Sequence, residues 1–83
     1  MDADEVGLDR EPIVAPTAFK HGIEPEDALH AFHHPMRAWD MGDGFVMLIG
    51  GDTAGNLLEI GYVEGDRAPV IIHAMRARDK FLR

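Results

Sequence analysis

One histidine and two arginines lie close together near the end of the chain: His73, Arg76 and Arg78. Histidine exchanges protons near neutral pH because its ordinary pKa is about 6.5. Arginine stays protonated and binds phosphate oxygens through paired hydrogen bonds. With His73 on the last predicted strand and the arginines just beyond it, the three residues indicate proton transfer beside a phosphoryl group. The alternative is a structural histidine in the core and two arginines that bind acidic residues of a partner.

Three more side chains can belong to the same site: His21, Glu59 and Tyr62. Each also has a structural interpretation. His21 precedes Gly22 and can donate to the carbonyl groups that end a helix. Glu59 can pair with an arginine, and Tyr62 can belong to the core. Three cations complete the predicted set, either as ligands of phosphates or of a partner, or as solvated side chains: Arg37, Lys80 and Arg83.

A separate histidine cluster, His30, His33 and His34, lies just before Pro35. Spacings of three and four residues place such side chains on adjoining faces of a helix, a geometry that can bind a transition metal. Cations at the end of a helix are the plainer interpretation, because they complement the helix dipole. We therefore expect no metal and no other cofactor.

Charge is unevenly distributed over the 83 residues. The formal net charge is −7, which disfavours a general nucleic-acid binder. Residues 1–11 carry five acidic side chains and one basic one, whereas residues 67–83 carry five basic side chains and one acidic one. No apolar run has the length of a membrane span, the N-terminus lacks the order of a signal peptide, and there is no cysteine. We expect a cytoplasmic protein.

The hydrophobic pattern predicts an acidic disordered tail over residues 1–11 and a single domain over 12–83. Proline and glycine positions predict a short helix within 12–21 and a second one from Pro25 to Pro35. Alternation then predicts strands. The expected fold class is α+β, with two short N-terminal helices packed on a four-stranded antiparallel sheet, whose strands cover residues 37–41, 45–49, 57–63 and 70–75.

Three stretches, in order and with consistent spacing, resemble the BrnT-like family of toxins. Residues 20–35 resemble the family signature K-H-G-[IV]-x-x-E-[ED]-A-x-x-x-F-x-x-P. Residues 48–60 are similar to its strand pair I-G-x-[ST]-x-x-G-R-x-L-x-V. Residues 71–78 lie where the family carries I-R-[IL]-I-[ST]-A-R-x-A. Together, the stretches that carry the resemblance span about three quarters of the chain.

This resemblance implies a RelE-like fold and the toxin half of a type II toxin–antitoxin pair. It implies a metal-independent endoribonuclease, neutralised by a protein antitoxin, that meets DNA only through that antitoxin. Such cleavage uses the 2′-OH as nucleophile, and it needs a base, an acid and cations. The predicted catalytic residues are then His73, Arg76, Arg78, His21 and Glu59, with Arg37, Lys80, Arg83 and Tyr62 as residues that bind RNA or a partner.

The acidic body of the chain leaves a second hypothesis open. A protein of the same fold that has lost the chemistry would bind a partner chain or itself, as a hetero-oligomer or a homodimer. A DNA-binding regulator is the third alternative, which the net charge disfavours.

Overall fold

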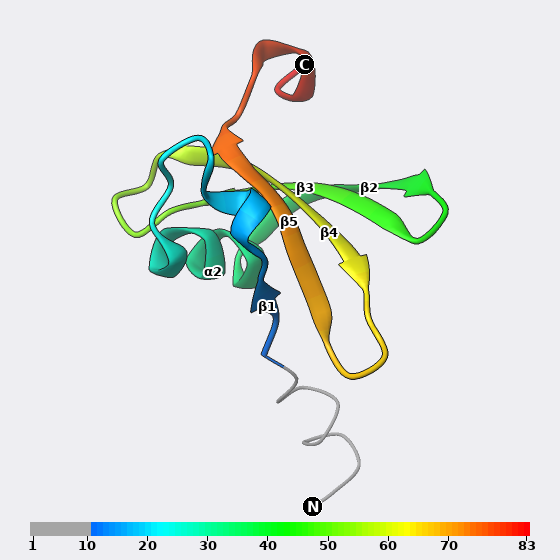
Figure 1. Cartoon of the computed structure of the whole chain (residues 1–83). Helices are drawn as coiled ribbons and strands as arrows, with labels where there is room; N and C mark the ends of the chain where they lie inside the picture. Colours follow the sequence, from blue (N-terminus) through cyan, green and yellow to red (C-terminus); the bar gives the residue numbers. More distant parts are fainter. Residues whose placement is uncertain (1–10) are drawn as a thin grey trace, which may run out of the picture.

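A computed structural model describes residues 11–83, which form one layer of strands with a single α-helix against one side (Figure 1). The sheet has five strands in the order β1-β5-β4-β3-β2. β1 runs parallel to β5, and the other neighbouring strands are antiparallel. The elements are β1 (Ile13–Val14), the 3-10 helix η1 (Pro16–Phe19), α2 (Pro25–His33), β2 (Pro35–Gly42), β3 (Phe45–Gly51), β4 (Leu57–Glu64), β5 (Pro69–Arg76) and the 3-10 helix η2 (Asp79–Phe81).

The predicted fold class, two short helices on a four-stranded antiparallel sheet, is wrong in two respects. The first expected helix is a 3-10 helix of four residues. Pro16 at its start and Gly22, with a φ of +81°, after its end leave room for little more than one turn. The two apolar residues of β1 also add a fifth strand, parallel to the start of β5, so the sheet is mixed. Most of the acidic tail expected over 1–11 lies outside the described residues.

α2 follows the proline and charge signals of its sequence. Pro25 occupies the first helical position, and Glu26 and Asp27 place negative charge in the first turn, where the helix dipole favours it. The Asp27 carboxylate also accepts hydrogen bonds from the backbone N–H and the hydroxyl of Thr53, at 3.0 and 2.6 Å. This contact joins the start of α2 to the loop between β3 and β4. Within residues 11–83, no helix is long and apolar enough to cross a membrane.

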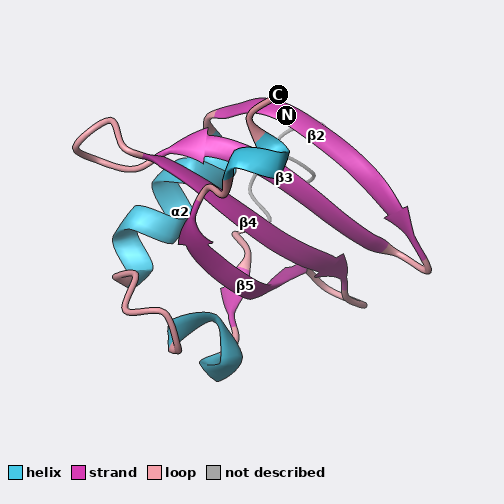
Figure 2. Cartoon of the chain, turned by 90° about the horizontal axis from the view of Figure 1, so that it is seen from above, coloured by secondary structure: helices cyan, strands magenta, loops and turns pink. Residues whose placement is uncertain are grey.

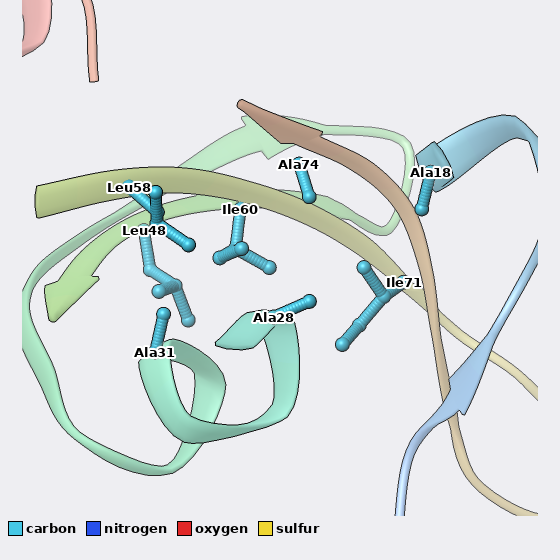
Figure 3. Packing of buried hydrophobic residues seen from close by; sticks show 8 residues of the cluster. All are labelled: Ala18, Ala28, Ala31, Leu48, Leu58, Ile60, Ile71 and Ala74. Carbon is cyan, nitrogen blue, oxygen red and sulfur yellow. The ribbon is translucent and has the colours of Figure 1, made fainter. Parts of the chain in front are cut away.

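The core lies between α2 and the sheet (Figure 3). Ala28 and Ala31 of α2 point towards Leu48 of β3 and Ile60 of β4, and all four side chains are buried. Because alanine is small, it allows the helix backbone to approach the strands closely. The remaining buried members of the cluster are Ala18, Leu58, Ile71 and Ala74.

The opposite face of the sheet is partly covered by the C-terminal segment, residues 77–83. Figure 1 shows this segment and α2 on opposite sides of the sheet, and Figure 2 shows it from above, crossing from β5 towards β2. The backbone N–H of Ala77 donates to the Leu57 carbonyl at 3.0 Å. Further along, the Phe81 ring lies 5.7 Å from the Trp39 ring of β2. Together these contacts place the segment over β4, β3 and β2.

We expect Gly50→Ala to destabilise the fold by about 1–3 kcal/mol, because a Cβ there has no space. It would collide with the carbonyl oxygen of Ala31 in α2 and lie 2.9 Å from the carbonyl oxygen of His34. Both atoms belong to the backbone, so the helix itself would have to move. Gly51→Ala is the matched control, since a Cβ at that position meets nothing within 4 Å. Urea unfolding curves of the two variants test this, and equal midpoints would contradict it.

Candidate functional site

A buried carboxylate, Glu59 of β4, is the centre of the candidate site. Its side chain is 0% exposed, yet both of its oxygens accept hydrogen bonds. One oxygen, Oε1, accepts from the backbone N–H of Arg78 at 2.9 Å and from its Nε at 3.1 Å. The other, Oε2, accepts from Nη2 of Arg78 at 2.7 Å and lies 2.8 Å from Nε2 of His73. The site therefore joins the middle of β4, the middle of β5 and the start of the C-terminal segment.

Strand alternation explains why this carboxylate is buried away from the helix. Leu58 and Ile60 point into the core beneath α2, so Glu59 between them points to the opposite face. Burial alone would raise the pKa of Glu59. Hydrogen bonds from Arg78 and His73 outweigh this effect and hold the pKa below its usual value, so the carboxylate is ionised at neutral pH.

The ionised carboxylate determines which nitrogen of His73 carries the proton. A carboxylate only accepts hydrogen bonds, so Nε2 of His73 must be the donor. In the neutral imidazole, Nδ1 is then the unprotonated nitrogen. No side chain or backbone group within residues 11–83 donates a hydrogen bond to it. The His73 side chain is 23% exposed, and it presents a base held in one tautomer.

His21 approaches His73 from the other end of the chain. The two imidazole rings make an edge-to-face contact with centroids 5.7 Å apart. His21 is exposed and lies between η1 and α2, in a turn that Gly22 closes with its positive φ. η1 packs along β5, where the Thr17 hydroxyl donates to the Ile72 carbonyl at 3.0 Å. Two proton-transfer groups thus meet at one place although 52 positions separate them in the sequence.

Two predicted site residues lie on the other face of the sheet. Arg76 pairs with Leu58, whose side chain lies in the core on the α2 side, and it acts on the carboxylate of Asp52 by charge. Tyr62 also faces α2, with its ring 5.1 Å from the Phe32 ring. Burial, together with the charge of Glu64, raises the pKa of the Tyr62 hydroxyl. The structure therefore separates Arg76 and Tyr62 from His73.

The three predicted binding cations lie at the other end of the C-terminal segment. Nη1 of Arg37 donates to the carbonyl oxygens of Phe81 and Arg83, at 3.4 and 2.9 Å. The guanidinium of Arg37 lies 5.5 Å from the Trp39 ring centroid, and the Lys80 ammonium lies 5.2 Å from that of Phe81. All three cations are exposed, and Arg37 and Lys80 lie near aromatic rings.

The histidine cluster at the end of α2 is held by backbone carbonyl groups. Nδ1 of His30 lies 2.6 Å from the Gly51 carbonyl, and Nδ1 of His34 lies 2.8 Å from the His30 carbonyl. The two rings stack with centroids 4.2 Å apart, whereas His33 pairs with Glu11 at 3.2 Å. In the part of the chain that the structure describes, no three histidine or carboxylate side chains gather as a metal site.

Sequence reasoning missed the aromatic side chains of this face. Trp39, Phe45 and Phe81 are all half-buried on the side of the sheet away from α2. A Cβ at Gly61 would lie 2.9 Å from two ring atoms of Phe45, so this glycine leaves the space that the ring occupies next to His73. The alternation of Arg37 and Trp39 was the available signal. It could not show that the C-terminal segment would cross the same face.

Glu59 is expected to lose its stabilising effect in acid. Its pKa is lower in the folded protein than in the unfolded chain, so its contribution is present above about pH 4.3 and is lost as the pH falls through the folded-state pKa. The free energy of unfolding of the wild type minus that of Glu59→Gln should therefore narrow on acidification. Asp52 is present in both proteins, so its contribution to the pH dependence largely cancels in this difference.

Urea titrations of the two proteins between about pH 7 and pH 3 measure this difference. Asp66→Asn, in an exposed loop, is the control and should follow the wild type over the same range. A difference between the wild type and Glu59→Gln that does not change with pH would contradict the ionised state of Glu59.

Comparison with protein-family models, with curated proteins and with solved structures finds no match to this chain. The chemistry of the site therefore rests on its own geometry.

Proposed function

We propose that this chain is the toxin of a type II toxin–antitoxin pair of the BrnT-like family, a cytoplasmic, metal-independent endoribonuclease. The observation that carries the proposal is the contact of His73 with His21, with His73 held in one tautomer by the buried Glu59. Two adjacent imidazoles supply a base and an acid, the pair of groups that RNA cleavage through the 2′-OH requires.

In the proposed reaction, Nδ1 of His73 removes the proton of a ribose 2′-OH. The 2′-oxygen then forms a bond to the adjacent phosphorus, and the bond from phosphorus to the 5′-oxygen breaks. Protonated His21 gives its proton to that leaving oxygen. The products are a 2′,3′-cyclic phosphate and a 5′-hydroxyl, and no metal takes part.

Glu59 and Arg78 act as positioning residues in this scheme. Glu59 fixes the tautomer and orientation of the base, as a carboxylate does for histidine in many hydrolases. Arg78 directs Nε and Nη2 towards Glu59, so one edge of its guanidinium is occupied inside the protein. The phosphate charge is then met by the exposed cations at the end of the C-terminal segment.

The antitoxin is proposed to bind along the exposed edge of β2. Seven of its eight residues are exposed, among them Met36 at 66% and Met41 at 51%. An edge strand offers unpaired backbone groups to a strand from another chain. This edge is also what favours the second candidate function, a catalytically inactive module that binds a partner chain.

Incubation of the purified protein with single-stranded RNA in the presence of EDTA tests the proposal. We expect cleavage products that end in a 2′,3′-cyclic phosphate. The matched substrate carries a single 2′-deoxy sugar at the cleaved position and should stay intact there, because it lacks the nucleophile. RNA that remains uncleaved over a wide range of protein concentrations would contradict the ribonuclease and leave the interaction module.

A further inference from the structure

The sheet face away from α2 carries half of the aromatic residues of the chain. The chain has four phenylalanines, one tyrosine and one tryptophan. Trp39, Phe45 and Phe81 lie on this face, and we call these three residues the aromatic face. Each ring is half-buried, so a part of it is open to solvent. Tyr62 and Phe32 face the opposite way, where they contact each other.

Strand register connects the aromatic face to the candidate catalytic histidine. Trp39 pairs with Met47, Met47 with Gly61, and Gly61 with His73. These four residues form one row across four strands. Three strand spacings separate Trp39 from His73, roughly 14 Å. Phe45 fills the space above Gly61, between the ends of this row. An extended ligand lying along the row would contact Trp39 and His73 together.

Cations lie against the rings of the aromatic face. Arg37 is 5.5 Å from the Trp39 centroid, and Arg78 and Lys80 are 5.5 and 5.2 Å from the Phe81 centroid. The one buried carboxylate of this face, Glu59, is already neutralised by Arg78. Arg37 and Lys80 therefore remain as cations beside the rings, in a chain whose net charge is −7 and whose η2 also carries Asp79.

From these observations we propose that the aromatic face binds single-stranded RNA, with unpaired bases stacked on Trp39 and Phe81 and with phosphates on Arg37 and Lys80. Aromatic rings interleaved with cations are how proteins bind single strands, since every base has a face that stacks. Protein–protein interfaces are also rich in aromatic residues and arginine, but lysine, such as Lys80 here, is depleted in them. The inference rests on the proposed function, because it supplies the substrate of the same site.

The chain contains a single tryptophan, so its fluorescence reports on this surface alone. The probe is a short 2′-O-methyl oligonucleotide of mixed sequence, which binds like RNA but lacks a free 2′-OH. We expect it to quench the fluorescence of Trp39 and to bind more weakly as salt rises. The same oligonucleotide in a duplex should not quench, because its bases are already stacked on one another.

Variants separate base stacking from charge attraction. We expect Trp39→Leu to weaken binding of a labelled oligonucleotide, measured by anisotropy, by about tenfold or more. Trp39→Phe should retain most of the affinity. Phe19→Ala is the matched control, because Phe19 is 40% exposed on η1 and does not belong to the aromatic face. Circular dichroism of each variant establishes that the fold is kept, and the quenching of the wild type tests the proposal even if Trp39→Leu fails to fold.

Equal affinity for the single strand and the duplex, or no quenching at any concentration, would overturn the proposal. Protection of Trp39 from acrylamide by a co-expressed partner protein, with no quenching by the oligonucleotide, would assign the aromatic face to that protein instead. Quenching without cleavage of the corresponding RNA would support RNA binding by the aromatic face and overturn the ribonuclease. Cleavage by Trp39→Leu with an unchanged KM would support the ribonuclease and overturn RNA binding by the aromatic face.

Discussion

We expect His73→Gln to cleave RNA about 10²- to 10⁴-fold more slowly than the wild type, the usual contribution of a general base. Glutamine can still donate a hydrogen bond to Glu59, so the carboxylate keeps this partner. It cannot accept and release a proton near neutral pH. The comparison therefore removes the proposed chemistry while it retains the contact that holds β4 and β5 together at this point.

Single-turnover cleavage, followed by gel, measures this effect. His33→Gln is the matched control, because His33 is exposed and, within residues 11–83, its ring contacts Glu11 and the ring of Phe32. It should cleave at the wild-type rate. A His73→Gln variant that retains its fold and more than about a tenth of the activity would remove His73 from the role of general base.

Glu59→Ala is expected to lower the free energy of unfolding by about 3 kcal/mol, the lower part of the range for breaking a buried ion pair. The substitution leaves the backbone N–H of Arg78 and Nε2 of His73 without their acceptor. The lower part of the range applies because the Arg78 side chain is 47% exposed and can turn towards water. Chemical denaturation monitored by circular dichroism measures the loss.

A double-mutant cycle with Arg78→Ala isolates the coupling. If Glu59 and Arg78 act as a unit, the sum of the two single-variant losses in free energy of unfolding should exceed the loss in the double variant. Glu11→Ala is the control, since its pair with His33 is exposed and such pairs contribute little. Additive losses at Glu59 and Arg78 would show that the carboxylate is stabilised by other groups.

Local patterns predicted the elements that have strong local signals. Pro25 and Pro35 bracket α2, and alternating apolar residues cover β3, β4 and β5. The two residues of β1 have no such signal, because a pair of apolar side chains before a proline is common in any loop. β1 is a strand only because β5 offers its edge, and that is a property of the folded sheet.

The candidate site shows a second kind of limit. Simple alternation places Ile71 and His73 on the same face, yet Ile71 lies in the core beneath α2 and His73 lies opposite. A β-bulge causes this, since Tyr62 pairs with Ile71 and Gly61 with His73, leaving Ile72 without a partner residue. The chain continues as a strand to Arg76, which therefore points to the α2 side. Arg78 lies beyond the strand and is free to turn back to Glu59.

The pairing of β1 with β5 also has a consequence for when the protein can fold. Ile13 pairs with Val70 and Val14 with Ile71, so 57 positions separate the partners in each pair. Contacts of such long range require closure of a large loop and slow the folding of small domains. On the ribosome, β1 has no strand to join until β5 has emerged from the exit tunnel. The complete sheet, and with it the meeting of His21 and His73, must therefore form after β5 has emerged.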